Sequence, residues 1–233
     1  MKVFAIVIKD HKLSEHAYEV LKKSSNDVGN DFEIERFDAV TPDTVEGVML
    51  ENGLMWNYPD SGSKFDVHSG LLKSAYGGKH KRRYACAMSH YLLWLECKKS
   101  NEPILILEHD AIFKHELKYD SIVDSNYDVI GINEPRGNTR LAQKFHSMVQ
   151  VYGAANVVDC PMIDNIKVPQ GLAGASAYIM KPAGATNVIH ATIEYGLWPN
   201  DAILCNQLIP NLGVTKRYFT DTQKIPSTTF TNA

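Results

Sequence analysis

The sequence has no strong excess of positive or negative charge and no long hydrophobic run, and each of these absences excludes a class of protein. Lysine and arginine number 24 against 27 aspartate and glutamate residues, a formal net charge of −3, so no overall basic field favours DNA or RNA. No apolar run reaches the roughly 20 residues that a membrane-spanning helix needs. We therefore expect no nucleic acid partner and no transmembrane segment, which leaves peripheral contact with a membrane open.

Cysteine is also scarce, and its positions carry no metal or disulfide pattern. The four cysteines show no paired ligand spacing. The apolar stretch from Val3 to Ile8 is too short for the core of a signal peptide. We expect reduced thiols in a cytoplasmic protein.

The composition that remains is that of a globular protein. Hydrophobic residues make up 44% of the 233 residues and charged residues 22%. This length predicts a single domain over residues 1–233, with a polar C-terminal tail from about residue 219. The oligomeric state does not follow from these features.

Apolar runs alternate with helical patterns, which predicts an α/β fold. Val3 to Ile8 and Phe32 to Phe37 have the pattern of buried strands, and between them we expect a helix from His16 to Lys23, capped by Ser14. This opening favours a mixed, mostly parallel Rossmann-type sheet with helices on both faces.

The rest of the chain continues the alternation. A loop-like region covers residues 52–80, with some helix expected near 69–76. Later expected elements are helices over 82–99, 182–195 and 198–208, a strand that begins at Ile104, and strands over 127–132 and 175–180.

Ligands of such sheets collect beyond the carboxyl ends of the strands. Lys9 follows the first strand, and Asp38 and Val40 follow the second. These residues are therefore candidates for ligand binding.

Two carboxylates end the most apolar run of the chain. Glu108 and Asp110 follow Ile104 to Leu107, and the alternation of a strand would place them on one side with His109 on the other. Two acids in one volume are costly unless a divalent cation compensates their charge, and Mg²⁺ and Mn²⁺ prefer carboxylate oxygens. The pattern indicates metal-assisted phosphate chemistry, with a solvated turn as the plain alternative.

Four further residues have both a functional and a structural interpretation. Arg82 lies in the basic run Lys79 to Arg83 before a helix, as a phosphate ligand or as a solvated corner. Ser89 and His90 point about 100° apart on that helix, so they line a pocket or join the core rather than form a nucleophilic pair. Asp201 begins a helix, either as its cap or as a general base.

Taken in order, these blocks resemble those of glycosyltransferase family 25, the group of bacterial lipopolysaccharide galactosyltransferases and collagen galactosyltransferase domains. The blocks are Glu35 to Val40, Cys86 to His90 with Trp94, Ile106 to Ala111, Gly171 to Tyr178, Lys181 to Ala185 and Pro199 to Asp201, with Ser227 in the tail. The family usually has Glu-Asp-Asp where this chain has Glu108-His109-Asp110. An arginine-rich stretch that the family often carries after the first strand is replaced by Lys9-Asp10-His11-Lys12.

The resemblance implies a GT-A fold and an inverting transfer of a hexose, galactose or glucose, from a UDP-sugar to a glycan or glycolipid acceptor. It implies a Mn²⁺ or Mg²⁺ ion on Glu108 and Asp110, and Asp201 as the base. The donor would be held by the candidates already named, which are Lys9, Asp38, Val40, Arg82, Ser89 and His90.

Two rival functions stay open at this point. A metal-dependent phosphoesterase also uses carboxylates at a strand end, and it would release phosphate without an acceptor. A degenerate, non-catalytic domain would bind a sugar nucleotide or carbohydrate without metal enhancement.

Overall fold

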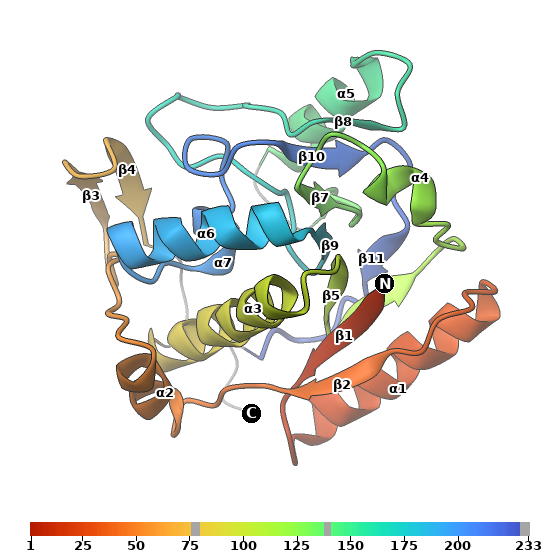
Figure 1. Ribbon diagram of the computed structural model, residues 1–233, viewed down its shortest axis with the longest axis horizontal. Coiled ribbons are helices and arrows are strands. Elements are labelled where there is room, and N and C mark those ends of the chain that lie inside the picture. Colours follow the sequence, from red (N-terminus) through yellow and green to blue (C-terminus); the bar gives the residue numbers. More distant parts are fainter. Residues whose placement is uncertain (76–79, 138–140, 229–233) are drawn as a thin grey trace.

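The computed structural model describes residues 1–75, 80–137 and 141–228. Its centre is a seven-stranded sheet in the order β2-β1-β5-β9-β7-β10-β8 (Figure 1). The strands are β1 (Lys2–Val7), β2 (Glu35–Asp38), β5 (Ile104–Glu108), β7 (Val129–Gly131), β8 (Val157–Asp159), β9 (Ala177–Met180) and β10 (Leu212–Thr215).

The sheet is mixed and mostly parallel, as the sequence predicts. Strands β2, β1 and β5 pair in parallel, and so do β7 and β10. Strand β9 runs antiparallel between β5 and β7, and β8 runs antiparallel at the far edge. The carboxyl ends of β1, β2, β5, β7 and β10 therefore meet at one edge of the sheet.

Each face of the sheet has its own helices. Alternate residues of β1 and β5, such as Phe4 and Ile106, pack in one apolar cluster with α3 (His80–Ser100) and α6 (Pro182–Tyr195). The residues of β1 and β5 that point to the other face of the sheet, such as Val3 and Leu105, pack with α1 (Lys12–Asp27). The strands are apolar on both faces because both faces are covered (Figure 1).

Helix α1 begins four residues before the expected start. Its N-cap is His11, whose Nδ1 accepts from the backbone N–H of Ser14 at 3.3 Å. The Ser14 hydroxyl accepts instead from the N–H of Ile8, at 2.9 Å. Ser14 therefore ties the end of β1 to the helix and does not cap it.

Residues 63–74 form a β-hairpin, so the helix expected near 69–76 is wrong. Strand β3 (Ser63–Asp66) pairs antiparallel with β4 (Leu71–Ser74), and Tyr76 lies outside the described residues. Lys73 is fully buried, where its ammonium donates to the Asn57 carbonyl at 2.7 Å and lies 3.4 Å from Asp66 Oδ2. Tertiary burial of β4 overrides its weak local pattern.

Helix α6 matches its expected bounds, with Pro182 in the first turn. The helix expected over 198–208 is shorter, because α7 spans Asn200–Ile203 before the chain turns and Cys205 pairs with Gly171. The remaining elements are α2 (Val45–Glu51), β6 (Ala111–Phe113), α4 (Asp120–Val123), α5 (Ala142–Val151) and β11 (Thr220–Thr222).

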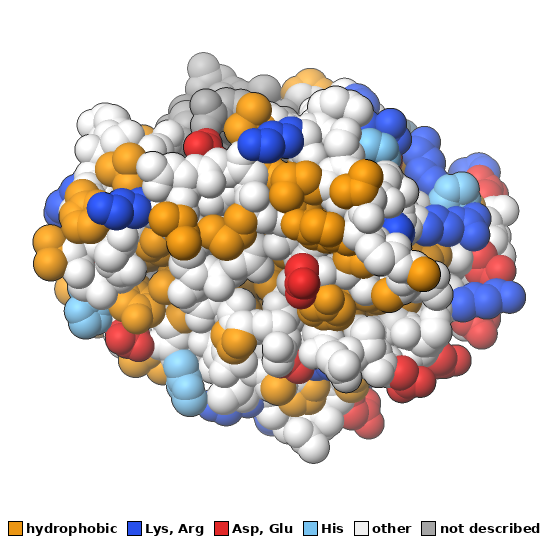
Figure 2. Space-filling model, turned by 90° about the horizontal axis from the view of Figure 1, so that it is seen from above, with side chains coloured by type: hydrophobic (Ala, Val, Ile, Leu, Met, Phe, Trp, Pro, Cys, Tyr) orange, Lys and Arg blue, Asp and Glu red, His pale blue; other side chains and the backbone are white. Residues whose placement is uncertain are grey.

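Part of the segment expected as a polar tail, Thr220–Thr222, forms strand β11. Strand β11 pairs antiparallel with β6, which directly follows the carboxylate turn. Among the helices of the described residues, none has the length and apolar character to cross a membrane. Hydrophobic side chains on the face seen in Figure 2 are interspersed with polar and charged ones.

Candidate functional site

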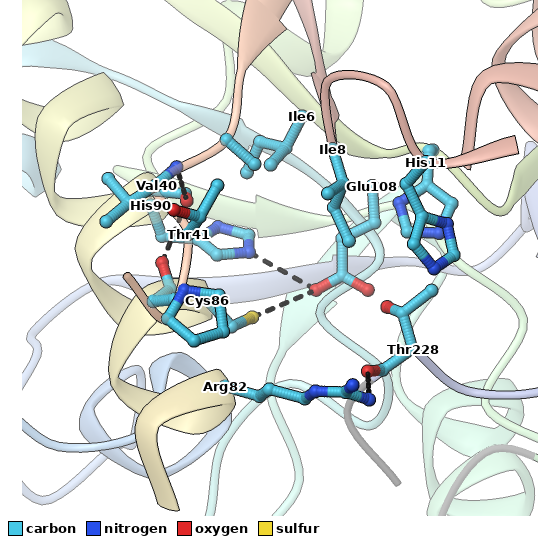
Figure 3. A pocket seen from close by; sticks show the side chains of 15 residues that line it. Ile6, Ile8, His11, Val40, Thr41, Arg82, Cys86, His90, Glu108 and Thr228 are labelled. Atoms are coloured by element: carbon cyan, nitrogen blue, oxygen red, sulfur yellow. Dashed lines mark hydrogen bonds and ion pairs between the residues drawn. The ribbon is translucent and has the colours of Figure 1, made fainter. Parts of the chain in front are cut away.

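A cavity of about 180 Å³ opens at the carboxyl ends of β1, β2 and β5 (Figure 3). Fifteen residues line it. They come from the ends of β1 and β5, from the segments that follow β1, β2 and β5, from helix α3 and from the C-terminal segment. Because parallel strands end there together, the topology brings residues far apart in sequence into one site.

One wall of the cavity is apolar. It is formed by Ile6, Ile8, Ala39 and Val40. The Ser89 hydroxyl accepts from the backbone N–H of Val40 at 2.9 Å and itself donates to a carbonyl of its own helix. Ser89 thus fixes the backbone at Val40, and the apolar side chains here suit the packing of a planar ring.

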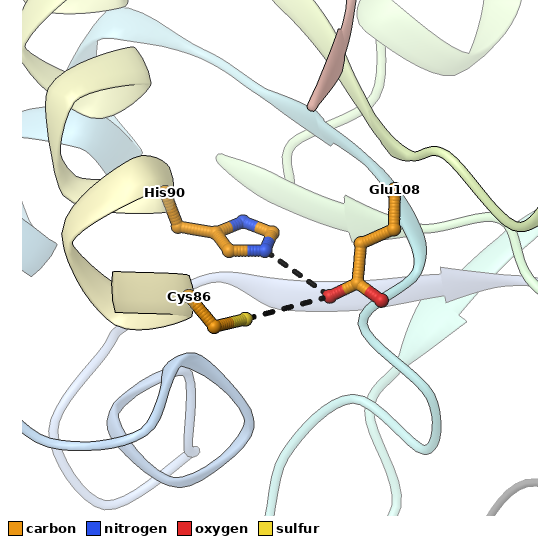
Figure 4. Close-up of side chains that lie close together, drawn as sticks. All are labelled: Cys86, His90 and Glu108. Carbon is orange, nitrogen blue, oxygen red and sulfur yellow. Dashed lines mark hydrogen bonds and ion pairs between the residues drawn. The ribbon is translucent and has the colours of Figure 1, made fainter. Parts of the chain in front are cut away.

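Glu108 is the acidic residue of the cavity and lies next to Ile6 in the sheet. Its carboxylate ends β5 and faces helix α3, from which His90 and Cys86 point toward it (Figure 4). His90 Nε2 lies 3.2 Å from Glu108 Oε1, and Cys86 Sγ lies 4.0 Å from the same oxygen. The Glu108 side chain is still 28% exposed, so it remains accessible to a ligand.

A buried chain of hydrogen bonds orients His90. Trp94 Nε1 donates to the Tyr178 hydroxyl at 2.8 Å, and that hydroxyl lies 2.8 Å from His90 Nδ1. The hydroxyl proton then has His90 Nδ1 as its acceptor, which leaves the proton of the imidazole on Nε2, facing Glu108. His90 is therefore a donor to the carboxylate.

This donor keeps Glu108 ionised. Burial by itself would raise the pKa of Glu108, but the hydrogen bond that His90 donates to it, together with one from the Ser176 hydroxyl, lowers that pKa below its ordinary value. Glu108 is thus the anionic member of the site.

Asp110 is the opposite case. It lies in the turn after β5, and its Oδ1 is buried without a hydrogen-bond partner. Burial, with the neighbouring charge of Glu108, raises the pKa of Asp110 to about 7. The backbone of the turn is held by Gln223, whose N–H donates to the Asp110 carbonyl at 2.8 Å.

The strand ends at Glu108, so the alternation of faces stops there. His109 lines the cavity together with Glu108, and the expectation that it faces away is wrong. Asp110 is not among the lining residues of this cavity, although the charge of Glu108 raises its pKa.

Asp201 stands in the first turn of α7. The residue keeps an exposed surface, yet the atoms crowded around its carboxyl group and the charge of Glu108 raise its pKa to about 6. Its neighbour Asn200 is buried and lies 3.6 Å from Cys86 Sγ through Oδ1, which ties α7 to the helix that carries His90.

The residues present fit a hard divalent cation. The ligand atoms of Cys86, His90 and Glu108 all lie within 4.8 Å of one another. Burial raises the pKa of Cys86 well above its ordinary value, so the thiol stays protonated and is a poor ligand for Mn²⁺ or Mg²⁺. Asp110 Oδ1, buried without a partner in the turn after Glu108, is a harder ligand atom, and a cation near both residues would compensate two carboxylates.

Of the remaining candidates from the sequence, one lines the cavity and two are exposed. Arg82 lines the cavity and donates to the Thr228 carbonyl at 2.8 Å, whereas Lys79 of its basic run lies outside the described residues. Lys9 is exposed, outside the lining. Asp38 is exposed too, and its Oδ1 lies 2.6 Å from Arg36 Nε, two residues away on the same face of the strand.

Sequence reasoning missed several lining residues. His11 and Thr41 follow the ends of β1 and β2, and their positions after strands were a usable signal. Cys86 lies one helical turn before His90, which was a second signal. Thr228 reaches the cavity only through the path of the C-terminal segment, for which no local pattern exists.

The mixed, mostly parallel sheet, with Glu108 in a cavity at its carboxyl edge, agrees with the GT-A-like fold expected from the sequence. The chain belongs to glycosyltransferase family 25 (LPS biosynthesis protein), whose model matches residues 9–204. This confirms the resemblance drawn from the sequence blocks.

Solved structures of glycosyltransferases are similar to the chain at low sequence identity. An active-site mutant of LgtC is 9% identical over 97% of this chain and 88% of its own, with a TM-score of 0.46. The galactosyltransferase LgtC with donor and acceptor sugar analogues is 11% identical (92% and 72% covered, TM-score 0.43), and mouse xyloside xylosyltransferase 1 is 10% identical (88% and 78%, TM-score 0.41). No curated protein matches the chain.

Proposed function

We propose that the protein is a metal-dependent, inverting glycosyltransferase that moves galactose or glucose from a UDP-sugar to a glycan acceptor. The observation that supports this proposal is Glu108 in an apolar cavity at the carboxyl edge of the sheet, followed in the next turn by Asp110, whose buried Oδ1 has no hydrogen-bond partner. Family membership supports the reaction class.

The cavity provides separate places for the parts of the donor. The apolar wall that contains Ile8 and Val40 suits the uracil ring, and Arg82 in the same cavity suits a phosphate. Glu108 and Asp110 would hold Mn²⁺ or Mg²⁺, which neutralises charge on the diphosphate when bound.

Asp201 acts as the general base. The acceptor oxygen forms a bond to C1 of the hexose, its proton passes to the Asp201 carboxylate, and the bond from C1 to the diphosphate oxygen breaks with its electron pair on UDP. A carboxylate with a pKa of about 6 is a stronger base than an ordinary aspartate and is still mostly ionised at pH 7.

Thermal unfolding with a panel of UDP-sugars, each with and without Mn²⁺, tests the donor and the metal together. We expect UDP-galactose or UDP-glucose to raise the melting temperature only with Mn²⁺, because a ligand that binds the folded state alone stabilises it. A shift that ignores the metal would favour the non-catalytic binding domain. Release of phosphate from nucleotides without an acceptor would favour the phosphoesterase.

Slow hydrolysis of the α-linked donor, with water as acceptor, tests the stereochemistry and the base. We expect the released hexose to appear first as the β-anomer in proton NMR spectra. An Asp201→Asn variant should lose about 100- to 10,000-fold in turnover, the usual contribution of a general base. Glu194→Gln, an exposed carboxylate on α6, is the matched control, and near-normal turnover of the Asp201→Asn variant would remove Asp201 from this role.

A further inference from the structure

A second cavity, of about 430 Å³, opens at the same edge of the sheet, over β7 and β10. It is lined by residues that follow those strands and by residues from β11, α5 and the segment after β6. Its cationic or titratable basic side chains are Lys114, His115, Arg136, His146, Lys216 and Arg217.

The carboxylates of this cavity do not neutralise it. Glu134 is already held by Arg136, with Nε–Oε1 and Nη2–Oε2 distances of 2.8 and 2.9 Å. Asp221 is held by Lys224, whose Nζ lies 3.0 Å from its Oδ1. Both acids are therefore paired before any ligand arrives.

Three cations remain without a carboxylate. Lys216 donates to the carbonyls of Tyr152 and Gly153, at 2.8 and 2.7 Å, which are neutral acceptors. In residues 1–75, 80–137 and 141–228, no side-chain hydrogen bond or ion pair holds Lys114 or Arg217. Uncompensated like charges around one cavity repel one another, and an anion would relieve that repulsion.

The second cavity flanks the site of the proposed reaction. Strand β6 begins directly after Asp110 and Lys114 directly follows it, a separation of about 13 Å for four residues of extended chain. Asp221 lines the second cavity, and Gln223, two residues later, holds the Asp110 carbonyl. A glycan that extends from the reacting centre therefore has a path to the basic side chains.

We propose that this cavity binds an anionic substituent, a phosphate or a carboxylate, on the acceptor glycan. The inference rests on the proposed function and adds the chemical class of the acceptor. The donor diphosphate is assigned to the first cavity, beside Glu108 and Asp110, so it does not account for the second. Lysine and arginine side chains recognise phosphate and carboxylate oxygens by charge-assisted hydrogen bonds.

Binding of small probes tests the cavity without any transfer reaction. Glucose 6-phosphate, glucuronate and glucose would be titrated by ligand-observed NMR against the full chain saturated with UDP and Mn²⁺. We expect one or both anionic sugars to bind at least tenfold more tightly than glucose, and their comparison separates a phosphate from a carboxylate ligand. In a Lys114→Ala/Arg217→Ala variant the dissociation constant of the anionic probe should rise at least tenfold.

The control removes two positive charges elsewhere. Lys98→Ala/Lys99→Ala, at the exposed end of α3, should leave binding of the anionic probe within twofold of the wild type. Equal weakening in both variants, equal binding of glucose, or absence of binding would each overturn the proposal. The melting-temperature shift with UDP-hexose and Mn²⁺ is read on the same proteins, so failure of the donor site is distinguished from failure of the basic cavity.

Discussion

At the scale of single residues, the environment separates three carboxylates that share one region. The pKa of Glu108 is lowered by His90, whereas burial and the charge of Glu108 raise the pKa values of Asp110 and Asp201. Such a separation is how one site holds both an anionic ligand group and a base. The roles proposed for these residues follow from their surroundings.

Replacing Asp110 should change how the stability of the metal-free protein depends on pH. The folded pKa, about 7, lies above the ordinary 3.8, so the folded protein keeps a proton that the unfolded chain releases between these values. Stability should therefore fall by a few kcal/mol as the pH rises from about 4 to 7. In Asp110→Asn, urea unfolding in EDTA should give a flatter profile, and exposed Asp31→Asn should keep the wild-type slope.

Tyr178 should be needed for the stability of the buried hydrogen-bond chain. In Tyr178→Phe, Trp94 Nε1 and His90 Nδ1 lose their shared partner in the core, which costs about 1–3 kcal/mol per unsatisfied group. Urea unfolding measures this loss. Tyr127→Phe removes a hydroxyl bonded to Asp159 at the surface and should cost under about 1 kcal/mol; a similar cost for both would contradict the prediction.

At the scale of elements, α7 is positioned by the backbone opposite it. Helix α7 has four residues, too few for its own packing to fix its position. The chain after α7 is held by a bridge between Cys205 and Gly171. A Cβ built on Gly171 would lie 1.6 Å from the Leu204 carbonyl oxygen. The backbone on both sides of this contact therefore approaches closely because no side chain stands between, which fixes the end of the helix that carries Asp201.

Gly171→Ala should accordingly displace α7. We expect a loss of about 3 kcal/mol or more in unfolding free energy, because backbone rather than a flexible side chain must shift. Gly47→Ala is the matched control, since its Cβ meets nothing within 4 Å and lies in α2, where alanine favours the helix by about 1 kcal/mol. An unfolding free energy of Gly171→Ala equal to that of the wild type would show that the backbone contact between Gly171 and Leu204 is not tight.

At the scale of the whole molecule, the C-terminal segment returns to complete the site. Strand β11 pairs with β6, and the Gln223 amide donates to the carbonyls of Ala17, His109 and Ala111. The turn that carries Asp110 is therefore held by residues more than 100 positions away.

Gln223→Ala should loosen this turn without unfolding the sheet. Three backbone carbonyls lose their donor, so we expect binding of UDP-hexose with Mn²⁺ to weaken about tenfold, near 1.4 kcal/mol, while the circular dichroism spectrum is retained. Calorimetric titration measures the affinity, with exposed Gln143→Ala on α5 as control. Unchanged affinity would mean that the turn holds its own shape.

Local patterns predicted the elements that have strong periodicity of their own. The helical spacing of apolar residues located α3, the aliphatic run located β5, and Pro182 marked the start of α6. A helix was expected where strand β4 lies, and the helix expected around α7 was too long. The conformations of both segments depend on burial and on partners far along the chain.

The sequence by itself determined three features: a mostly parallel sheet whose strands end at one edge, the position of Glu108 at the end of one of these strands, and the family to which the chain belongs. Only the tertiary structure decided that His90 donates to Glu108, that Asp110 keeps an unpartnered buried oxygen, and that a basic cavity lies beside them. The reason is physical: periodicity is a property of neighbouring residues, whereas hydrogen-bond partners, burial and charge balance depend on segments that meet only in the folded chain.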